Sequence, residues 1–295
     1  MSAAAEIRRP ALRYHGGKWR LAPWIISHFP SHRVYVEPYG GAASVLLRKP
    51  RGKAEIYNDL DGEVVNLFQV VRDRGAELVA AIELTPYARD EFYLSFIHSD
   101  DPLERARRLV LRSFAGYGGN LTKPNRDGTP QRTGFRTYCG TGRGRSTCGD
   151  WRALPAEVRK IIERMQGVCI EHRDALRVMH DHDSPSTLHY VDPPYVHATR
   201  GMDSGGSHRG YRFEMTDDQH RELAHVLRSL KGMVVLSGYQ SDLYTQLYSG
   251  WVRLDHRSHA DGARPRIESI WLNPASAEAR PQQSLLDSIE RGQGT

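Results

Sequence analysis

The stretch HYVDPPYVHA, residues 189–198, places an acidic side chain, two prolines and an aromatic ring directly after an apolar run. Consecutive prolines cannot donate to a sheet ladder or sit inside a helix, so a strand must stop here and present Asp192 and Tyr195 at its end. The carboxylate and the carbonyls of Pro193 and Pro194 accept hydrogen bonds from an amino group. An aromatic ring beside these acceptors stacks on a planar base. The stretch therefore predicts a planar substrate that carries an exocyclic amine.

A second chemical signal is the glycine turn in VYVEPYGGAASVLL, residues 34–47. A strand that runs into Gly40-Gly41 and then into a helix start brings the backbone close to a nucleotide-like ligand. Asp59 closes the next strand, 18 residues after Gly41. This is near the spacing at which an acidic residue bonds ribose hydroxyls in such folds. A tight connection without a ligand has the same pattern, and either Asp59 or Asp61 can cap the following helix.

The stretch LRYHGGKWRL, residues 12–21, sets Lys18 after two glycines, as a phosphate-binding loop does. That loop also requires glycine at position 12 and Ser or Thr at position 19, where this chain has Leu12 and Trp19. The mismatch argues against an ATPase or a kinase.

Composition limits the class of protein. The 295 residues carry a formal net charge of +6, with 39% hydrophobic and 26% charged residues, which is typical of a globular protein that tolerates nucleic acid as a partner. No run approaches the roughly 18 apolar residues of a membrane helix, and the N-terminus has no apolar signal core. We therefore expect a cytoplasmic protein without membrane contact. Three widely spaced cysteines predict neither a disulfide framework nor a metal site, although Cys169 and His172 have a C-x-x-H spacing.

The elements that position these groups alternate between strands and helices. Short β-branched runs with breakers at their ends predict strands at residues 33–38, 54–59, 168–174, 188–194, 233–238, 251–255 and 266–272. Apolar stripes at helical spacing predict helices at residues 19–29, 62–74 and 216–230, and the last begins with Thr216 and Gln219 at capping-box spacing. The alternation predicts an α/β fold with a mostly parallel sheet. The last two strands have no long helix between them, so we expect an antiparallel hairpin at the sheet edge.

Residues 118–150 interrupt this pattern. They contain eight glycines and six Lys or Arg against two Asp, without a helical stripe. A long irregular stretch in a compact domain is usually functional or disordered. We expect residues 73–165 to be an insertion of helices and loops into a core formed by residues 11–72 and 166–275, with polar tails at residues 1–10 and 276–295.

Four motifs occur in a characteristic order: YHGGKWRLAPWI, VYVEPYGGAASVLL, YNDLDGEVVNLF and YVDPPY. Together they resemble the D12-class, Dam-like N6-adenine DNA methyltransferases, over about residues 12–274. The resemblance implies a Rossmann-like methyltransferase fold that uses S-adenosyl-L-methionine, an inserted target-recognition domain, and double-stranded DNA as the partner. It implies no obligate protein partner.

The resemblance also assigns roles to individual residues. The implied cofactor contacts are Tyr14, Lys18, Gly41, Asp59, Asp174 and Asp192. This chain has Tyr14 where the family usually has Trp, and Ala43 where the family has a later glycine of the cofactor loop. The loop must therefore accept a Cβ. Asp174 is the position expected to meet the cofactor's adenine, although an Asp there can also simply cap a helix.

The implied reaction is methylation of adenine N6 in a base flipped out of the duplex. Asp192 and the Pro193 carbonyl would accept the two amine hydrogens, Tyr195 would stack on the base, and no covalent enzyme intermediate is needed. The insertion would contact DNA through Lys123, Arg126, Arg132, Arg136, Arg143 and Arg145. We also expect the glycine-rich stretch at residues 200–213 to be a flap that orders over DNA.

Other functions stay open at this point. Cytosine N4 also offers an exocyclic amine, and RNA is an alternative substrate. A catalytically inactive DNA-binding module could keep the same fold, but the intact Asp192, Tyr195, Asp59 and Lys18 argue against it. A nucleotide-dependent oxidoreductase would explain the glycine turn and leave Asp-Pro-Pro-Tyr unexplained. Neither the recognition sequence nor a restriction partner can be derived from these motifs.

Overall fold

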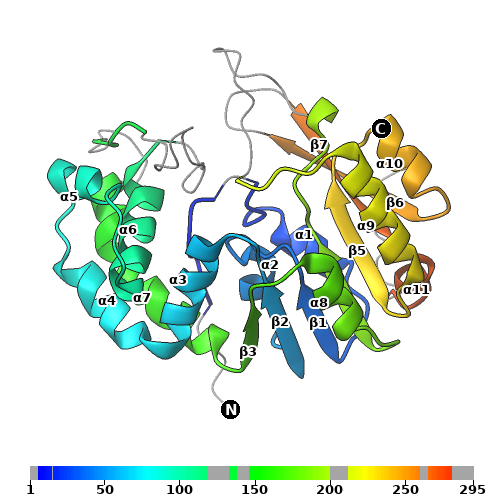
Figure 1. Ribbon diagram of the computed structural model, residues 1–295, viewed down its shortest axis with the longest axis horizontal. Coiled ribbons are helices and arrows are strands. Elements are labelled where there is room, and N and C mark those ends of the chain that lie inside the picture. Colours follow the sequence, from blue (N-terminus) through cyan, green and yellow to red (C-terminus); the bar gives the residue numbers. More distant parts are fainter. Residues whose placement is uncertain are drawn as a thin grey trace, which may run out of the picture.

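The computed structural model describes residues 6–14, 16–117, 133–137, 146–199, 212–259 and 265–280. Its centre is a seven-stranded sheet with the strand order β3-β2-β1-β4-β5-β7-β6 (Figure 1). The first five strands in that order are parallel, and β7 runs antiparallel to both β5 and β6. The strands are β1 (Val34–Glu37), β2 (Ala54–Asn58), β3 (Val168–Glu171), β4 (Thr187–Val191), β5 (Met233–Gly238), β6 (Val252–His259) and β7 (Pro265–Leu272).

The predicted α/β fold with a mostly parallel sheet and an antiparallel edge hairpin is confirmed. Each of the seven predicted strands is present, and the largest difference is that β6 extends to residue 259 instead of 255. This strand continues because it pairs with β7 along its full length, from Val252 opposite Leu272 onward. In this hairpin β7 lies between β5 and β6, and β6 forms the edge of the sheet.

The predicted helices at residues 62–74 and 216–230 agree closely with the structure, whereas the one predicted at residues 19–29 is confined to Ala22–Ser27, with a proline in its first turn. The helix at residues 217–229 has the predicted capping box, formed by Thr216 and Gln219. The helices are α1 (Ala22–Ser27), α2 (Ser44–Arg48), α3 (Gly62–Asp73), α4 (Gly75–Leu84), α5 (Arg89–Leu94), α6 (Pro102–Ala115), α7 (Thr147–Met165), α8 (Ala175–Asp181), α9 (Asp217–Ser229), α10 (Asp242–Leu247) and α11 (Pro274–Glu278).

The irregular stretch predicted at residues 118–150 was wrong at its C-terminal end. Helix α7 already begins at Thr147, within residues 118–150, because the Ser146 hydroxyl accepts from the Gly149 N–H and caps the first turn. Trp151 anchors that turn: its side chain is buried and its indole N–H donates to the Thr85 carbonyl. Gly149 and Pro155 are poor helix formers, so they conceal this helix in the sequence.

Both faces of the sheet are covered. Along β5, Met233 and Val235 pack into one hydrophobic cluster, whereas Val234 and Leu236 pack into another that includes α9. In Figure 1, α8 and α9 lie over one face of the strands. Strands buried on both sides read as continuous apolar runs, which is what MVVLSG shows.

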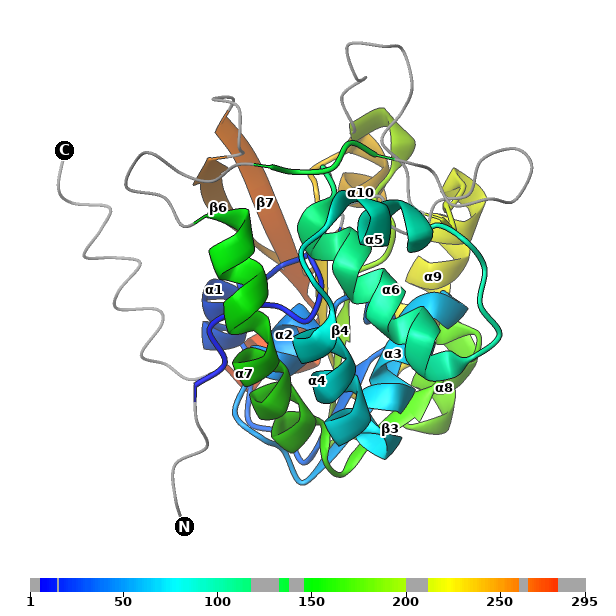
Figure 2. The same cartoon turned by 90° about the vertical axis from the view of Figure 1, so that its left-hand side faces the viewer.

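Helices α4 to α7 form a group beside the sheet and face the viewer in Figure 2. Their buried side chains, such as Leu109 and Ile161, belong to the same hydrophobic cluster as Tyr35 and Tyr190 of the sheet. The division into a core and an insertion at residues 73–165 stays a prediction. No helix in the described part of the chain combines the length and the apolar character needed to cross a membrane.

Candidate active site

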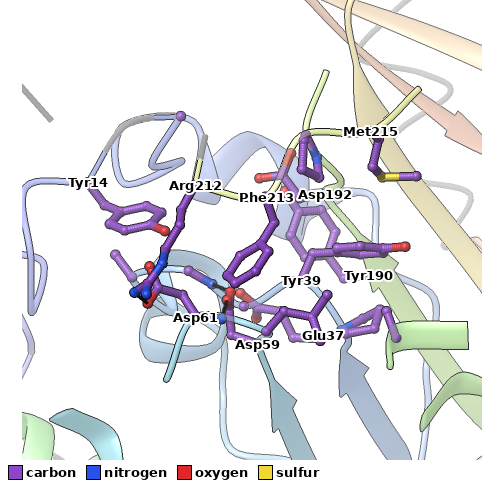
Figure 3. Close-up of a pocket in the computed structure, with 18 of the residues that line it drawn as sticks. Tyr14, Glu37, Tyr39, Asp59, Asp61, Tyr190, Asp192, Arg212, Phe213 and Met215 are labelled. Atoms are coloured by element: carbon purple, nitrogen blue, oxygen red, sulfur yellow. Dashed lines mark hydrogen bonds and ion pairs between the residues drawn. The ribbon is translucent and has the colours of Figure 1, made fainter. Parts of the chain in front are cut away.

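A cavity of about 450 Å³ opens where the parallel strands end (Figure 3). β1 lies between β2 and β4. After β1 the chain adds β2 and β3 on one side of this strand, and it later adds β4 and β5 on its other side, so the strand order reverses at β1. Ligands of open α/β sheets bind at such a switch point, outside the carboxyl ends of the strands. The residues that follow β1, β2 and β4 all contribute to the wall of this cavity, among them Gly41, Asp59 and Asp192.

The glycine turn forms one wall. Gly41 has φ +47°, and Ala43 adopts the left-handed conformation with φ +53°. The loop therefore does accept a Cβ at position 43, at a conformational cost of about 1 kcal/mol for a residue other than glycine. The turn is held on two sides, because the Tyr57 hydroxyl donates to the Gly41 carbonyl at 2.7 Å and the Gly41 N–H donates to Asp59 Oδ2 at 2.7 Å.

Asp59 and Asp61 have different partners. Asp59 ties two loops together, since its Oδ1 accepts from the Asp61 N–H at 2.7 Å while Oδ2 holds Gly41. Burial raises the pKa of Asp59 to about 6. Asp61 is the N-cap of α3 and accepts from the Glu63 N–H at 3.0 Å. The structure thus decides which acidic residue caps the helix and leaves Asp59 at the glycine turn.

Asp192 lies at the opposite wall, in contact with Lys18. The Lys18 ammonium is 3.0 Å from Asp192 Oδ2 and 4.6 Å from the centre of the Tyr195 ring. Burial raises the pKa of Asp192, and the charge of Lys18 opposes this effect. Asp192 Oδ1 is buried and has no hydrogen-bond partner among the described residues. Asp192 thus lines the cavity with one carboxylate oxygen paired to Lys18 and the other buried without a hydrogen-bond partner among the described residues.

The rest of the Asp-Pro-Pro-Tyr motif is divided between the cavity wall and the interior. Pro194 lines the cavity, whereas Pro193 is buried behind it. Tyr195 is 5% exposed and does not line the cavity. Its hydroxyl donates to Glu268 Oε2 at 3.1 Å. Stacking of a base on Tyr195 stays a prediction.

The remaining predicted cofactor residues also meet at the cavity. Tyr14 and Lys18 line it, and the ring of Tyr14 lies against the glycine turn: a Cβ built on Gly41 would stand 3.3 Å from that ring. Asp174 lines the cavity and also caps α8, since its carboxylate accepts from the Arg177 N–H at 3.1 Å. Capping uses one acceptor position and does not exclude a second partner.

Most of the predicted DNA contacts lie outside the described residues, namely Lys123, Arg126, Arg132, Arg143 and Arg145. Arg136 is described, and its backbone is fixed: its N–H donates to the Ala115 carbonyl, and its own carbonyl accepts from the Tyr87 hydroxyl, both at 2.8 Å. Of the predicted flap at residues 200–213, only Arg212 and Phe213 are described.

The structure adds residues that the sequence patterns did not indicate. Arg212 pairs with Asp61 at 3.0 Å, and Phe213 follows it into the cavity (Figure 3). Glu37 lies at the end of β1 and is fully buried, with a pKa raised by burial to about 8. The only signal for Glu37 was its place directly before Pro38 and the glycine turn. The other lining residues that were missed include Tyr39, Tyr190, Met215, Gln219 and Glu222.

Comparison with protein families gives one decisive match. The model of the D12 class N6 adenine-specific DNA methyltransferases matches residues 14–260. The chain belongs to this family. Its members methylate adenine N6 in DNA, and this is the activity of the present D12 enzyme.

Individual relatives agree with the family match. The D12 enzyme is 26% identical to a DNA adenine methylase of Salmonella typhimurium over 280 residues, which cover 88% of this chain and 90% of the relative. It is 24% identical to a DNA adenine methylase of Haemophilus influenzae, over 82% of this chain and 83% of the relative. A DNA adenine methylase of Escherichia coli K12 is 32% identical over a shorter segment, 38% of this chain.

Proposed function

We propose that this D12 enzyme binds S-adenosylmethionine in the described cavity and methylates N6 of an adenine flipped out of double-stranded DNA, with Asp192 as the acceptor of the amine hydrogens. The observation that carries the proposal is the buried, unpartnered Oδ1 of Asp192 beside a cavity built around a glycine turn. When bound, S-adenosylmethionine supplies an electrophilic methyl group on a sulfonium.

The lining residues fit the cofactor part by part. The cavity volume of about 450 Å³ lies within the range of small-molecule sites. Carboxylates at Asp59 and Asp61 are acceptors for ribose hydroxyls, and Asp61 Oδ2 is buried without a hydrogen-bond partner among the described residues. Aromatic and apolar side chains, among them Tyr39, Phe213 and Met215, offer surfaces for a planar adenine.

Asp192 would act on the target amine through hydrogen bonding. The lone pair of adenine N6 is delocalised into the ring, so the nitrogen is a poor nucleophile. A carboxylate that accepts an N–H favours the tetrahedral nitrogen that forms during attack. Lys18 opposes the effect of burial on the pKa of Asp192 and so favours its ionised form. The chain thereby supplies positioning and electrostatic stabilisation and forms no covalent bond to the substrate.

Product identification tests the proposed target atom. The purified enzyme is incubated with methyl-labelled S-adenosylmethionine and duplex DNA of mixed sequence, the DNA is digested, and the labelled nucleoside is identified. We expect N6-methyladenine. Label in N4-methylcytosine, or in RNA but not in DNA, would contradict the proposal.

The role of Asp192 is tested by Asp192→Ala. We expect transfer to fall by at least about a thousandfold, because the variant loses an electrostatic contact made at the reacting nitrogen, while the dissociation constant of S-adenosylmethionine changes little. Calorimetry measures that constant separately. The matched control is Asp181→Ala, which removes an exposed acidic side chain paired with Arg173 at the end of α8 and should leave both quantities unchanged. Substantial transfer by Asp192→Ala would exclude this role.

A further inference from the structure

The Tyr195 hydroxyl is held by two residues that come later in the chain than the Asp-Pro-Pro-Tyr motif. Glu268, on β7, accepts from this hydroxyl at 3.1 Å, and Ser237, on β5, lies 3.2 Å from it. β5 and β7 pair antiparallel, with Gly238 opposite Ser269, which brings both partners beside the motif. A residue of the antiparallel edge hairpin therefore reaches a motif 73 positions earlier in the chain.

The single hydroxyl proton decides the direction of these bonds. Because Tyr195 donates to the Glu268 carboxylate, it can only accept from the Ser237 hydroxyl. Hydrogen bonds to an ionised carboxylate are about twice as strong as neutral ones. Tyr195 also interacts with Asp192 and thereby lowers the pKa of that carboxyl group, so the position of this side chain bears on the acidic residue at the cavity.

The ring of Tyr195 is also confined on its faces and edges. Tyr239 packs against it in a T-shaped arrangement with 4.7 Å between ring centres, and the Lys18 ammonium lies 4.6 Å from the ring centre. These contacts restrict rotation of the ring about its side-chain bonds. The bond to Glu268 holds the far end of the ring as well.

We propose that Glu268 is a positioning residue for methyl transfer: it fixes Tyr195 at the position where this side chain contacts Lys18, the ion-pair partner of Asp192. This inference rests on the proposed roles of Asp192 and Tyr195. Glu268 itself does not line the cavity.

Three variants separate the effect of the Tyr195–Glu268 hydrogen bond from the effect of the negative charge of Glu268. Glu268→Ala removes both, Glu268→Gln keeps an acceptor oxygen without the charge, and Tyr195→Phe removes the donor. We expect kcat to fall about tenfold or more in Glu268→Ala and by a similar factor in Tyr195→Phe. The double variant should fall no further than either single variant, because both remove one interaction. Glu268→Gln should keep kcat within about threefold, with an unchanged KM for S-adenosylmethionine.

A pH profile adds a result that a purely structural role would not produce. The negative charge of Glu268 is one of the smaller influences that raise the pKa of Asp192, after burial. In Glu268→Gln this charge is gone, so the acid limb of kcat, which reports ionisation of Asp192, should move to lower pH. Glu268→Ala should show the same displacement together with the reduced plateau.

The control is Asp255→Asn on β6, which removes an acidic group of the same hairpin that bonds Ser269 and not Tyr195. Its kinetics should equal those of the wild type. Equal loss in Glu268→Gln and Glu268→Ala, or multiplicative losses in the double variant, would overturn the inference. Tyr195→Phe leaves Glu268 in place, so it tests the inference even if a Glu268 variant fails to fold.

A further variant, Tyr195→Ala, keeps this inference apart from the proposed function. Full activity of Tyr195→Ala would contradict the proposed role of the Tyr195 ring in methyl transfer. A loss in Tyr195→Ala, combined with wild-type kinetics in Tyr195→Phe and Glu268→Ala, would reject only the role of Glu268.

Discussion

Four of the carboxyl groups that line the cavity differ in their partners and their burial. Asp61 is paired with Arg212 and caps a helix, and Asp192 is paired with Lys18. Asp59 accepts from two backbone N–H groups, yet burial still raises its pKa to about 6. Glu37 has no cationic partner within bonding distance among the described residues, and burial raises its pKa to about 8. At neutral pH, Glu37 is therefore mostly protonated.

This state of Glu37 predicts a pH dependence of stability. Its pKa is higher in the folded protein, about 8, than the ordinary value of 4.5 in the unfolded chain. The contribution of Glu37 to stability is therefore complete below pH 4.5 and is lost as the pH rises toward 8. We expect this group alone to lower the free energy of unfolding by several kcal/mol across that range. Urea unfolding of wild type and Glu37→Gln at several pH values measures it.

Glu37→Gln resembles the protonated carboxyl group and keeps an oxygen that accepts from the Tyr35 hydroxyl and the Leu46 N–H. The stability difference between wild type and this variant should therefore grow as the pH rises, in favour of the variant. Other groups titrate in both proteins and cancel in the difference. A difference that is constant between pH 5 and 8 would show that Glu37 is already ionised in the folded protein.

Among the elements, the turn from β1 to α2 depends most on its residue types. Gly40 contacts the ring of Tyr57 so closely that a Cβ would stand 2.1 Å from a ring carbon. Tyr57 is fully buried, and its hydroxyl holds the Gly41 carbonyl. The ring therefore cannot move aside without releasing the turn. A sequence pattern shows that glycines occur here, but only the packing shows that Gly40 is required for close approach and Gly41 for its positive φ.

Gly40→Ala should destabilise the protein by about 2 kcal/mol or more, because the methyl group overpacks a rigid aromatic contact. It should also weaken binding of S-adenosylmethionine, since the turn forms a wall of the cavity. Urea unfolding and calorimetry measure the two effects. The matched control is Gly52→Ala, where the nearest atoms to a Cβ are 3.5 Å away, and it should change stability by less than about 0.5 kcal/mol. Equal stability of the two variants would contradict the packing argument.

Across the whole molecule, the sheet and the helical group share a continuous hydrophobic cluster. A buried ion pair also links the parts: Arg164 of α7 contacts both oxygens of Glu55 on β2, at 2.6 and 2.9 Å. The described helices α4 to α7 are thus packed on the sheet through both apolar and charged contacts. The net charge of +6 favours a polyanionic partner without specifying its sequence.

Arg136 provides a test of the predicted DNA contacts within the described residues. If its side chain binds a phosphate, Arg136→Gln should weaken binding to all DNA sequences similarly and reduce the slope of log K against log[salt] by about 1. Backbone bonds hold residue 136 in place, so folding should be unaffected. Fluorescence anisotropy at several salt concentrations measures the slope. Arg72→Gln, at the end of α3 in an exposed pair with Asp73, is the control that should leave the slope unchanged.

Local patterns were sufficient for much of this structure. The strands, the capping box at Thr216 and the glycine turn depend on neighbouring residues, so their signals are present in short stretches of sequence. The order of four such motifs was enough to indicate the family and the edge of the sheet where the site lies. The start of α7 was missed because Gly149 and Pro155 weaken the local signal, while its anchor, Trp151, contacts a distant carbonyl.

The sequence by itself determined the fold class, the family and several key residues of the cavity wall, because each of these follows from local periodicity and motif order. Only the tertiary structure decided the pairings inside the site. Arg212 meets Asp61 across 151 positions, and Glu268 meets Tyr195 across 73. Such contacts arise because the sheet brings strands that are distant in the chain side by side, and no short-range pattern encodes which side chains then meet.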